Sequence, residues 1–403
     1  MKNRIFLLVM IWLSMALRMA SCESFLSRLP EVEPTMEAES QELLPAVELT
    51  TEPTMELESQ EPLPVENPWE LSTEPQEEVQ VSLELRIMQD PDIYTYEEML
   101  SDTEIMKNMF PGLFTVESLT QTADGREVLH YVIGSPNAES EIFINGAIHG
   151  REYLTAQLVM KQMVVYLQHI VDDEQYEDCS YQEMWQHCAV HVIPMINPDG
   201  VAISQFGLYG IWSQDVLETI YQVADMDGQS ASGSYLERWK ANAGGVDLNR
   251  NFDAFWEEYD GSPGHPSADH YKGTMPGSEA EAAALIELTN RSDFWYTINY
   301  HAQGRVIYWR FANMDSIESR ARSWVNELAA VTGYYPYEDY SIVDPAGYSD
   351  WAIYRKQIPS VILEVGLGTC PYISDQFDQI WWENLFVWEI TIRRTLMEKG
   401  LME

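Results

Sequence analysis

The chain has 403 residues, of which 45% are apolar and 13 are Trp, enough for a buried core in two average domains or in one large one. It carries 65 acidic and 23 basic residues, which give a formal net charge of -42. Binding to a phosphate backbone requires clustered Lys and Arg, so this balance excludes nucleic acid as an expected partner.

Residues 1–22 are predicted to be an export signal. An apolar run over residues 5–17 follows two basic residues and is too short to span a bilayer comfortably. The Ala-Ser-Cys sequence that ends at Cys22 resembles the lipid-attachment box of bacterial lipoproteins, although the Arg and Met just before it are atypical. A lipidated Cys22 that tethers the chain to a membrane is one alternative, and an ordinary cleaved signal with an incidental cysteine is the other. Both predict an extracellular or cell-surface protein.

Residues 23–89 are predicted to be a disordered acidic tether. Residues 31–80 contain 15 Glu and no Lys, Arg or Asp, and such a segment cannot bury enough apolar surface to fold. An internal repeat is also present, because EPTMEAESQELLP from Glu33 recurs as EPTMELESQEPLP from Glu52. A self-repelling, Pro-punctuated segment would hold a folded domain away from a membrane or wall. A pro-segment or a spacer with no specific role is the alternative.

Residues 90–403 alternate short apolar runs with amphipathic stretches, which is typical of an α/β domain with a largely buried sheet. Four runs are predicted to be buried strands, at residues 141–148, 189–196, 294–300 and 359–365. Helices that pack against a sheet are predicted at residues 151–170, 279–288, 316–333 and from Gln379 onward.

Each predicted strand leads directly to polar residues. These are His149 and Glu152 after the first, Asn197 and Asp199 after the second, His301 after the third and Glu364 at the end of the fourth. In open α/β sheets the ligand crevice lies beyond the carboxyl ends of the strands. We therefore expect these side chains to share one site.

His149 and Glu152 lie three residues apart in a predicted strand-to-helix turn, close enough to hold one metal ion. The pair alone is a weak signal, because a catalytic zinc needs three protein ligands and an open position for water. His301 is the best third candidate, since it ends a buried strand where a solvated histidine is unexpected. His191, inside a strand, is expected to be a core residue.

Five motifs occur in order along residues 90–395. They are GAIHGREYLTAQL around His149, INPDG at Ile196, GVDLNRNF at Gly245, YHAQG at Tyr300 and ILEVG at Ile362. Together they resemble the carboxypeptidase A superfamily of zinc peptidases. The resemblance implies one zinc ion per chain and a single α/β domain whose twisted mixed central sheet is flanked by helices.

The resemblance also implies that His149, Glu152 and His301 bind the zinc and that Glu364 deprotonates the water on it. Zinc lowers the pKa of a bound water to roughly 7, and a nearby carboxylate can then accept the proton. The alternative for Glu364 is a buried glutamate paired with Lys or Arg.

Asn249 and Arg250 match the family residues that hold the C-terminal carboxylate of the substrate. A planar guanidinium binds a carboxylate through two hydrogen bonds, which suits Arg better than Lys. The alternative is a pair that only braces its loop. Arg151 is similar to a family arginine that lines the cleft, or else it lies at the surface of the first helical turn.

Two positions depart from the family pattern. Lys240 stands where the family's oxyanion-stabilising arginine is expected, and because a lysine lacks the fork geometry, Arg238 is an alternative for this role. Ser349, just before Asp350, occupies the position that sets side-chain preference. A small uncharged residue there demands neither a basic nor a strongly apolar C-terminal residue.

The family's mobile substrate-capping tyrosine has no direct match. Strict register gives Ile342, and Tyr340 and Tyr348 are both alternatives. The four cysteines form no disulfide framework. Cys179 and Cys188 could bridge in an exported protein, and two unpaired buried thiols are the alternative.

WKANAGGVDLNRNF and YHAQGRVIYW resemble most the bacterial branch of the family that cleaves γ-D-glutamyl to diamino acid bonds in peptidoglycan stem peptides. We therefore expect a zinc metallocarboxypeptidase acting on such peptides or on other extracellular peptides. A zinc deacylase or amidohydrolase of the same fold is one alternative, although such relatives usually lack the Asn-Arg pair. A wall-peptide binding module with a degenerate site is another, and only Lys240 and the ambiguous tyrosine favour it.

Overall fold

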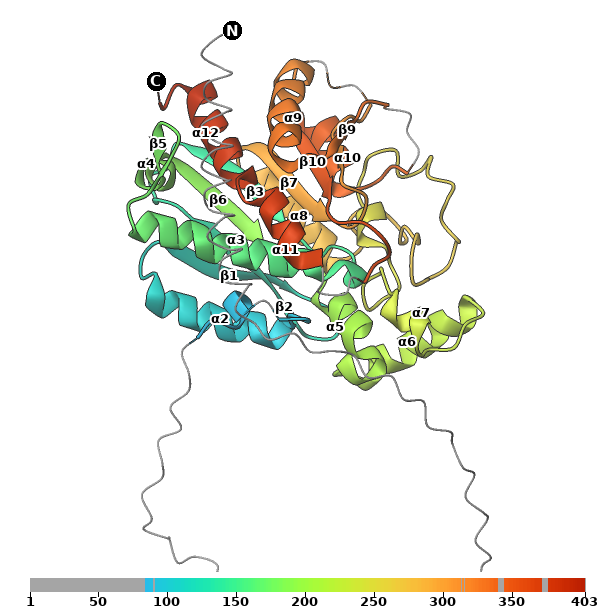
Figure 1. The fold of residues 1–403 in the computed structure, drawn as a ribbon. Coiled ribbons are helices and arrows are strands. Elements are labelled where there is room, and N and C mark those ends of the chain that lie inside the picture. Colours follow the sequence, from blue (N-terminus) through green and yellow to red (C-terminus); the bar gives the residue numbers. More distant parts are fainter. Residues whose placement is uncertain are drawn as a thin grey trace, which may run out of the picture. The chain divides into compact units, whose positions relative to one another are not determined.

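An eight-stranded sheet in the order β1-β2-β6-β3-β7-β10-β8-β9 lies at the centre of the folded unit (Figure 1). The computed structural model describes residues 84–89, 91–312, 314, 316–339, 344–371 and 376–402. The strands are β1 (Phe114–Gln121), β2 (Glu127–Ile133), β3 (Ser140–Asn145), β6 (Cys188–Ile193), β7 (Phe294–His301), β8 (Val306–Tyr308), β9 (Tyr335–Tyr337) and β10 (Ser360–Glu364). The sheet is mixed: β6, β3, β7 and β10 are parallel to one another, β1–β2, β2–β6 and β10–β8 are antiparallel pairs, and β8 and β9 are parallel. The predicted fold class is confirmed.

The four predicted strands are confirmed as β3, β6, β7 and β10. They occupy the middle of the sheet and are buried on both faces, so their sequences are near-continuous apolar runs. The other four strands were not predicted. β1 is largely exposed, and β8 and β9 have three residues each, so none of these three strands has a strong apolar pattern in the sequence.

Helices cover both faces of the sheet (Figure 1). The helices of the described residues are η1 (Arg86–Gln89), α2 (Tyr96–Met109), η2 (Gly150–Glu152), α3 (Leu154–Val171), α4 (Tyr181–His187), α5 (Pro198–Phe206), η3 (Gly207–Gly210), α6 (Gln214–Met226), α7 (Ser234–Glu237), η4 (Leu248–Arg250), α8 (Ala280–Arg291), α9 (Glu318–Thr332), α10 (Tyr348–Lys356), α11 (Phe377–Asn384) and α12 (Val387–Lys399). The predicted helical stretches are confirmed as α3, α8, α9 and the α11–α12 pair.

The packed region begins before residue 90, where we placed the end of the tether. Leu85 and Ile87 are buried in the core. The carboxylate of Asp102 accepts hydrogen bonds from the backbone amides of Arg86 at 2.7 Å and Ile87 at 2.8 Å, and these bonds hold η1 against α2. The boundary prediction is therefore about five residues too late, because a short 3-10 helix has no periodic pattern to reveal it.

The predicted export signal, Cys22 and the repeat lie outside the described residues. Within the described part of the chain, no helix has the length and apolar character needed to cross a bilayer. Cys179 and Cys188 are buried free thiols, so of the two alternatives the structure supports unpaired cysteines and not a disulfide.

Candidate active site

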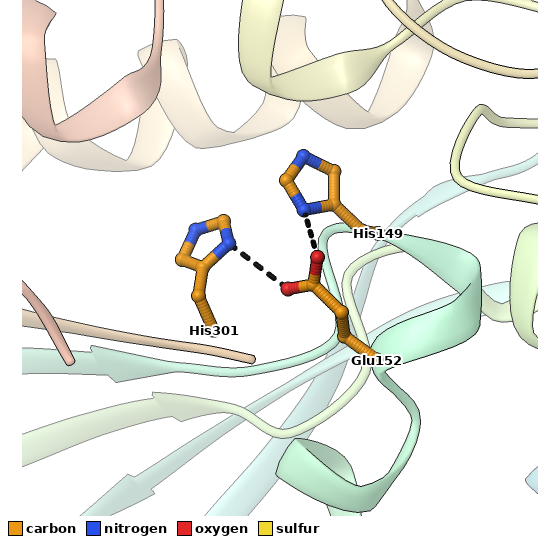
Figure 2. Close-up of side chains that lie close together, drawn as sticks. All are labelled: His149, Glu152 and His301. Atoms are coloured by element: carbon orange, nitrogen blue, oxygen red, sulfur yellow. Dashed lines mark hydrogen bonds and ion pairs between the residues drawn. The ribbon is translucent and has the colours of Figure 1, made fainter. Parts of the chain in front are cut away.

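Three polar side chains converge at the carboxyl ends of two neighbouring strands. His149 follows β3, Glu152 ends η2, and His301 is the last residue of β7. Both imidazoles point at the carboxylate of Glu152 (Figure 2), whose Oε1 lies 2.8 Å from Nδ1 of His149 and whose Oε2 lies 3.1 Å from Nδ1 of His301. The structure thus brings together the three residues that were predicted to bind metal.

This donor set fits a zinc ion. One possible ligand atom from each side chain lies within 4.8 Å of the other two, which gathers all three donors around one point. Two imidazoles and one carboxylate are a ligand set of catalytic zinc sites, which keep a fourth position for water. Although burial raises it, the neighbouring imidazoles of His149 and His301 hold the pKa of Glu152 well below its usual range. The carboxylate is therefore ionised, as a metal ligand must be.

The backbone between His149 and Glu152 depends on a close approach of two glycines. A Cβ on Gly150 would lie 2.3 Å from the carbonyl oxygen of Gly200 in α5. The amide of Gly150 also donates to the carbonyl of Lys240 at 3.1 Å. η2 therefore packs directly on α5, with no room for a side chain at Gly150.

Glu364 ends β10 directly beside His301. The parallel pairing of β7 with β10 sets the two residues opposite each other, and both line one cavity. Burial raises the pKa of Glu364 to about 7, and the nearby His301 acts in the opposite direction. No ion pair joins Glu364 to a Lys or Arg among the described residues. A carboxyl group with this pKa can both accept and release a proton near neutral pH.

The cavity has a volume of about 560 Å³ and is rich in charge. Its cationic side chains are Arg151, Arg238, Lys240, Arg250 and Arg310, and its acidic ones include Asp339, Asp344 and Asp350. A substrate that carries both carboxylate and amino groups would find partners of opposite charge on these walls.

Lys240 and Arg238 both line the cavity but differ in burial and in partners. Lys240 is 7% exposed, and its Nζ lies 3.3 Å from Oδ2 of Asp247, whereas Arg238 is exposed. Asp247 also lies beside His149, with its Oδ1 3.2 Å from Nε2 of that ring. The geometry therefore favours Lys240 over Arg238 as the positive charge next to the metal cluster.

Asp247 lies against the metal cluster, and the sequence did not lead us to expect it there. It is fully buried and faces the nitrogen of His149 that points away from Glu152. Although burial raises it, the charges of Lys240 and His149 hold the pKa of Asp247 well below its usual range. A carboxylate in this place fixes the tautomer and orientation of a metal-binding histidine. Its position two residues before Asn249, inside the DLNRNF motif, was the available signal.

Asn249 and Arg250 lie in η4, on the wall of the same cavity. The side-chain carbonyl of Asn249 accepts a hydrogen bond from the backbone amide of Tyr348 at 3.0 Å, which fixes the amide plane. Arg250 is 7% exposed, stacks over Tyr259 and lies 3.6 Å from Asp344. Both side chains line the cavity, where they can bind a ligand carboxylate.

Tyr348 is not a mobile cap. Its ring is fully buried at the start of α10 and packs edge-on against Phe143, and its hydroxyl lies 2.9 Å from that of Thr289. Tyr340, the other alternative, lies outside the described residues. Ser349 is buried in the same turn and is not among the residues that line the cavity. Asp350, the next residue, does line it.

Asn197 and Asp199 do not join the cluster, contrary to expectation. Asn197 caps α5 and donates to the carbonyl of Ala241 at 3.0 Å. Asp199 forms a buried ion pair with Arg126 at 3.0 Å. β6 lies two strands away from β7, so the residues after it brace the loops around the site instead of entering it.

This arrangement defines a zinc-dependent hydrolase, and comparison with known proteins gives the family. Residues 99–385 match the model described as zinc carboxypeptidase, so the chain belongs to the zinc carboxypeptidase family. It is 32% identical over 298 residues to gamma-D-glutamyl-L-diamino acid endopeptidase 1 of Lysinibacillus sphaericus, an alignment that covers 72% of this chain and 70% of the relative. It is 26% identical over 250 residues to carboxypeptidase B of Astacus astacus, with 60% and 73% covered.

Two solved structures show the same fold. Thrombin activatable fibrinolysis inhibitor superposes with a TM-score of 0.59 at 17% identity, covering 75% of this chain and 74% of that one. Carboxypeptidase A of Helicoverpa armigera gives a TM-score of 0.57 at 17% identity, with 76% and 75% covered. Membership of the zinc carboxypeptidase family makes the protein a metallopeptidase whose cofactor is zinc.

Proposed function

We propose that this metallopeptidase cleaves the bond between a γ-D-glutamyl residue and a diamino acid in peptidoglycan stem peptides. The relative from Lysinibacillus sphaericus is named for that bond. The observation that carries the proposal is the cavity, where Arg250 and Asn249 can bind a carboxylate and several Asp side chains can bind an amino group beside the metal cluster.

The side chains that line the cavity have distinct roles in this reaction. When bound, zinc polarises the scissile carbonyl and lowers the pKa of the attacking water. Glu364 accepts a proton from that water and donates it to the leaving amine. Lys240 stabilises the negative charge that develops on the carbonyl oxygen, while Arg250 and Asn249 hold the substrate carboxylate.

We also place the enzyme outside the cell, at the surface of the cytoplasmic membrane. The apolar run at residues 5–17, Cys22 and the acidic repeat support this placement. Lipidation of Cys22 would anchor the chain, and the segment that follows would let the catalytic domain reach the wall. Globomycin-sensitive processing and membrane fractionation test the anchor, and a Cys22→Ala chain that stays in the membrane fraction would contradict it.

The substrate assignment is tested with a stem tripeptide that ends in a diamino acid and with the same peptide amidated at that α-carboxylate. We expect amidation to lower kcat/KM about 100-fold, because a bidentate charged hydrogen bond is lost. Arg250→Lys should cause a similar loss on the free peptide and little further loss on the amide. Arg355→Lys, at an exposed pair with Asp253, is the matched control.

Equal turnover of the two peptides would remove the role of Arg250 and favour the deacylase alternative. Product analysis by mass spectrometry with acylated amino acids then distinguishes the two. Tight peptide binding without turnover at full zinc occupancy would indicate a binding module.

A further inference from the structure

A second cavity, of about 450 Å³, opens at the other end of the parallel strands. It is lined by residues of β1, β2, β6, the start of β3 and the end of α8, among them Glu117, His130, Glu141, His191 and Arg291. Glu141 is the second residue of β3, whereas His149 lies beyond the carboxyl end of that strand. The cavity is thus separate from the peptidase site.

Two histidines on neighbouring strands meet in this cavity. Nε2 of His130 in β2 lies 3.0 Å from Nδ1 of His191 in β6, and the rings are nearly parallel with centroids 5.0 Å apart. His130 is 2% exposed, and Phe294 packs edge-on against His191. His191, predicted to be a core residue, is instead half-buried and lines the cavity.

The outer nitrogen of His130 is held by a carboxylate. Its Nδ1 lies 3.1 Å from Oε1 of Glu117, the residue opposite it on β1, and Arg291 donates to the same oxygen at 2.9 Å. Metal-binding histidines usually donate their second N–H to a carboxylate in this manner. The peptidase site repeats the pattern, since Asp247 lies 3.2 Å from the outer nitrogen of His149.

The distance between Nε2 of His130 and Nδ1 of His191 suits a shared ion. Two nitrogens bonded to one zinc at about 2.0–2.1 Å in tetrahedral geometry lie about 3.3 Å apart, close to the spacing of His130 and His191. Burial lowers the pKa of His130, and it lowers the pKa of His191 to about 3, so both rings are neutral near pH 7. Since Glu117 accepts the proton of His130 Nδ1, the Nε2 of that ring carries a lone pair.

We propose that His130 and His191 form a second binding site for a divalent transition-metal ion such as zinc. Because Nε2 of His130 is unprotonated, Nδ1–H of His191 donates to it in the hydrogen bond that joins the two rings. On binding, this proton of His191 moves from Nδ1 to Nε2, so that two lone pairs face the ion and no proton is lost from the pair. Water and oxygens of the cavity complete the coordination. With two imidazole ligands, the site binds zinc more weakly than the three-ligand peptidase site and links β2 to β6.

The test counts zinc ions bound to the full-length chain after removal of all metal by a chelator. Equilibrium dialysis against rising free zinc should give two ions per wild-type chain, the second bound more weakly. His130→Gln/His191→Gln should bind one ion and keep its peptidase activity. His149→Gln/His301→Gln should also bind one ion, lose activity, and still show a zinc-dependent rise in Tm.

Saturation of the wild-type chain at one ion overturns the proposal, and so does a second ion that survives in the His130→Gln/His191→Gln chain. If that double variant does not fold, Glu117→Gln serves instead, with an expected loss of about tenfold in affinity for the second ion only. Because the ions are counted without substrate, the result is independent of the peptide that the enzyme cleaves.

Discussion

Glu364 is the side chain whose removal should separate metal binding from catalysis. Glu364→Gln keeps the shape of the residue and leaves the three ligand residues untouched, so the chain should still bind zinc. Activity should fall by about three orders of magnitude, because the proton acceptor and its charge are both lost. Zinc content measured beside kcat checks this, with the exposed Glu127→Gln as control. A variant with more than a tenth of wild-type activity would assign the base to another group.

Asp247 should tune the affinity for the metal without binding it. Asp247→Asn removes the charge that faces the outer nitrogen of His149, and the expected result is a 10- to 100-fold weaker zinc affinity. A competition titration with a coloured chelator measures the change. Asp253→Asn, at the exposed pair with Arg355, is the matched control. Unchanged affinity would show that His149 is oriented by its backbone alone.

Single residues differ in how well the sequence exposes their roles. His149, Glu152, His301 and Glu364 could be predicted because each follows a buried apolar run and falls in a recognisable motif. Asp247 was missed although it lies in the DLNRNF motif, because the residue pattern alone does not distinguish a partner of histidine from a solvated carboxylate in a loop. The role of Tyr348 was ambiguous because only the packing of the folded chain shows that its ring is buried.

At the level of elements, burial decides what the sequence reveals. The middle strands β3, β6, β7 and β10 have continuous apolar runs, whereas β1 alternates weakly and faces solvent for much of its length. The rule that polar residues cluster beyond the strand ends was correct for β3, β7 and β10. It failed for β6, which pairs with β3 but lies two strands away from β7, and the residues after it cap α5 and pair with Arg126 instead of entering the site.

The packing of η2 on α5 gives an element-scale prediction. Gly150→Ala should destabilise the fold by about 3 kcal/mol, the upper range for overpacking, because the new Cβ meets backbone atoms of Gly200 that cannot rotate away. Urea denaturation measures the change, and the shift of η2 should also weaken zinc binding. Gly244→Ala, whose Cβ would meet a side-chain oxygen of Asn242 at 3.3 Å, should cost less. Equal stability of the two variants would mean that η2 can move without disturbing the metal-binding residues beside it.

The whole molecule contains buried acids that the reaction does not use, and they set a pH dependence of stability. Burial raises the pKa of Glu281 to about 8 and that of Glu389 to about 7, from an ordinary value of about 4.3. At a pH between the ordinary pKa and the raised pKa of each group, the folded chain keeps a proton that the unfolded chain releases. The contribution of these two groups to the free energy of unfolding therefore falls as pH rises from about 4.3, up to about pH 8 for Glu281 and about pH 7 for Glu389, by up to about 1.4 kcal/mol per pH unit for each group.

Substitution of these acids should flatten that dependence. Glu281→Gln should lose little stability at pH 5 and gain stability relative to wild type at pH 8, as measured by urea denaturation across the range. The exposed Glu127→Gln should leave the profile unchanged. A Glu281→Gln profile parallel to that of wild type would show that Glu281 is ionised in the folded chain.

His301 and Glu364 stand at the ends of two adjacent strands that are hydrogen-bonded in register. Their spacing is therefore a property of the polypeptide ladder, about 4.8 Å between neighbouring strands, and not of any connecting segment. Segments beyond the strands can be lengthened, shortened or exchanged while that spacing persists. Altered selectivity in this scaffold is thus a matter of rebuilding loops around an invariant pair.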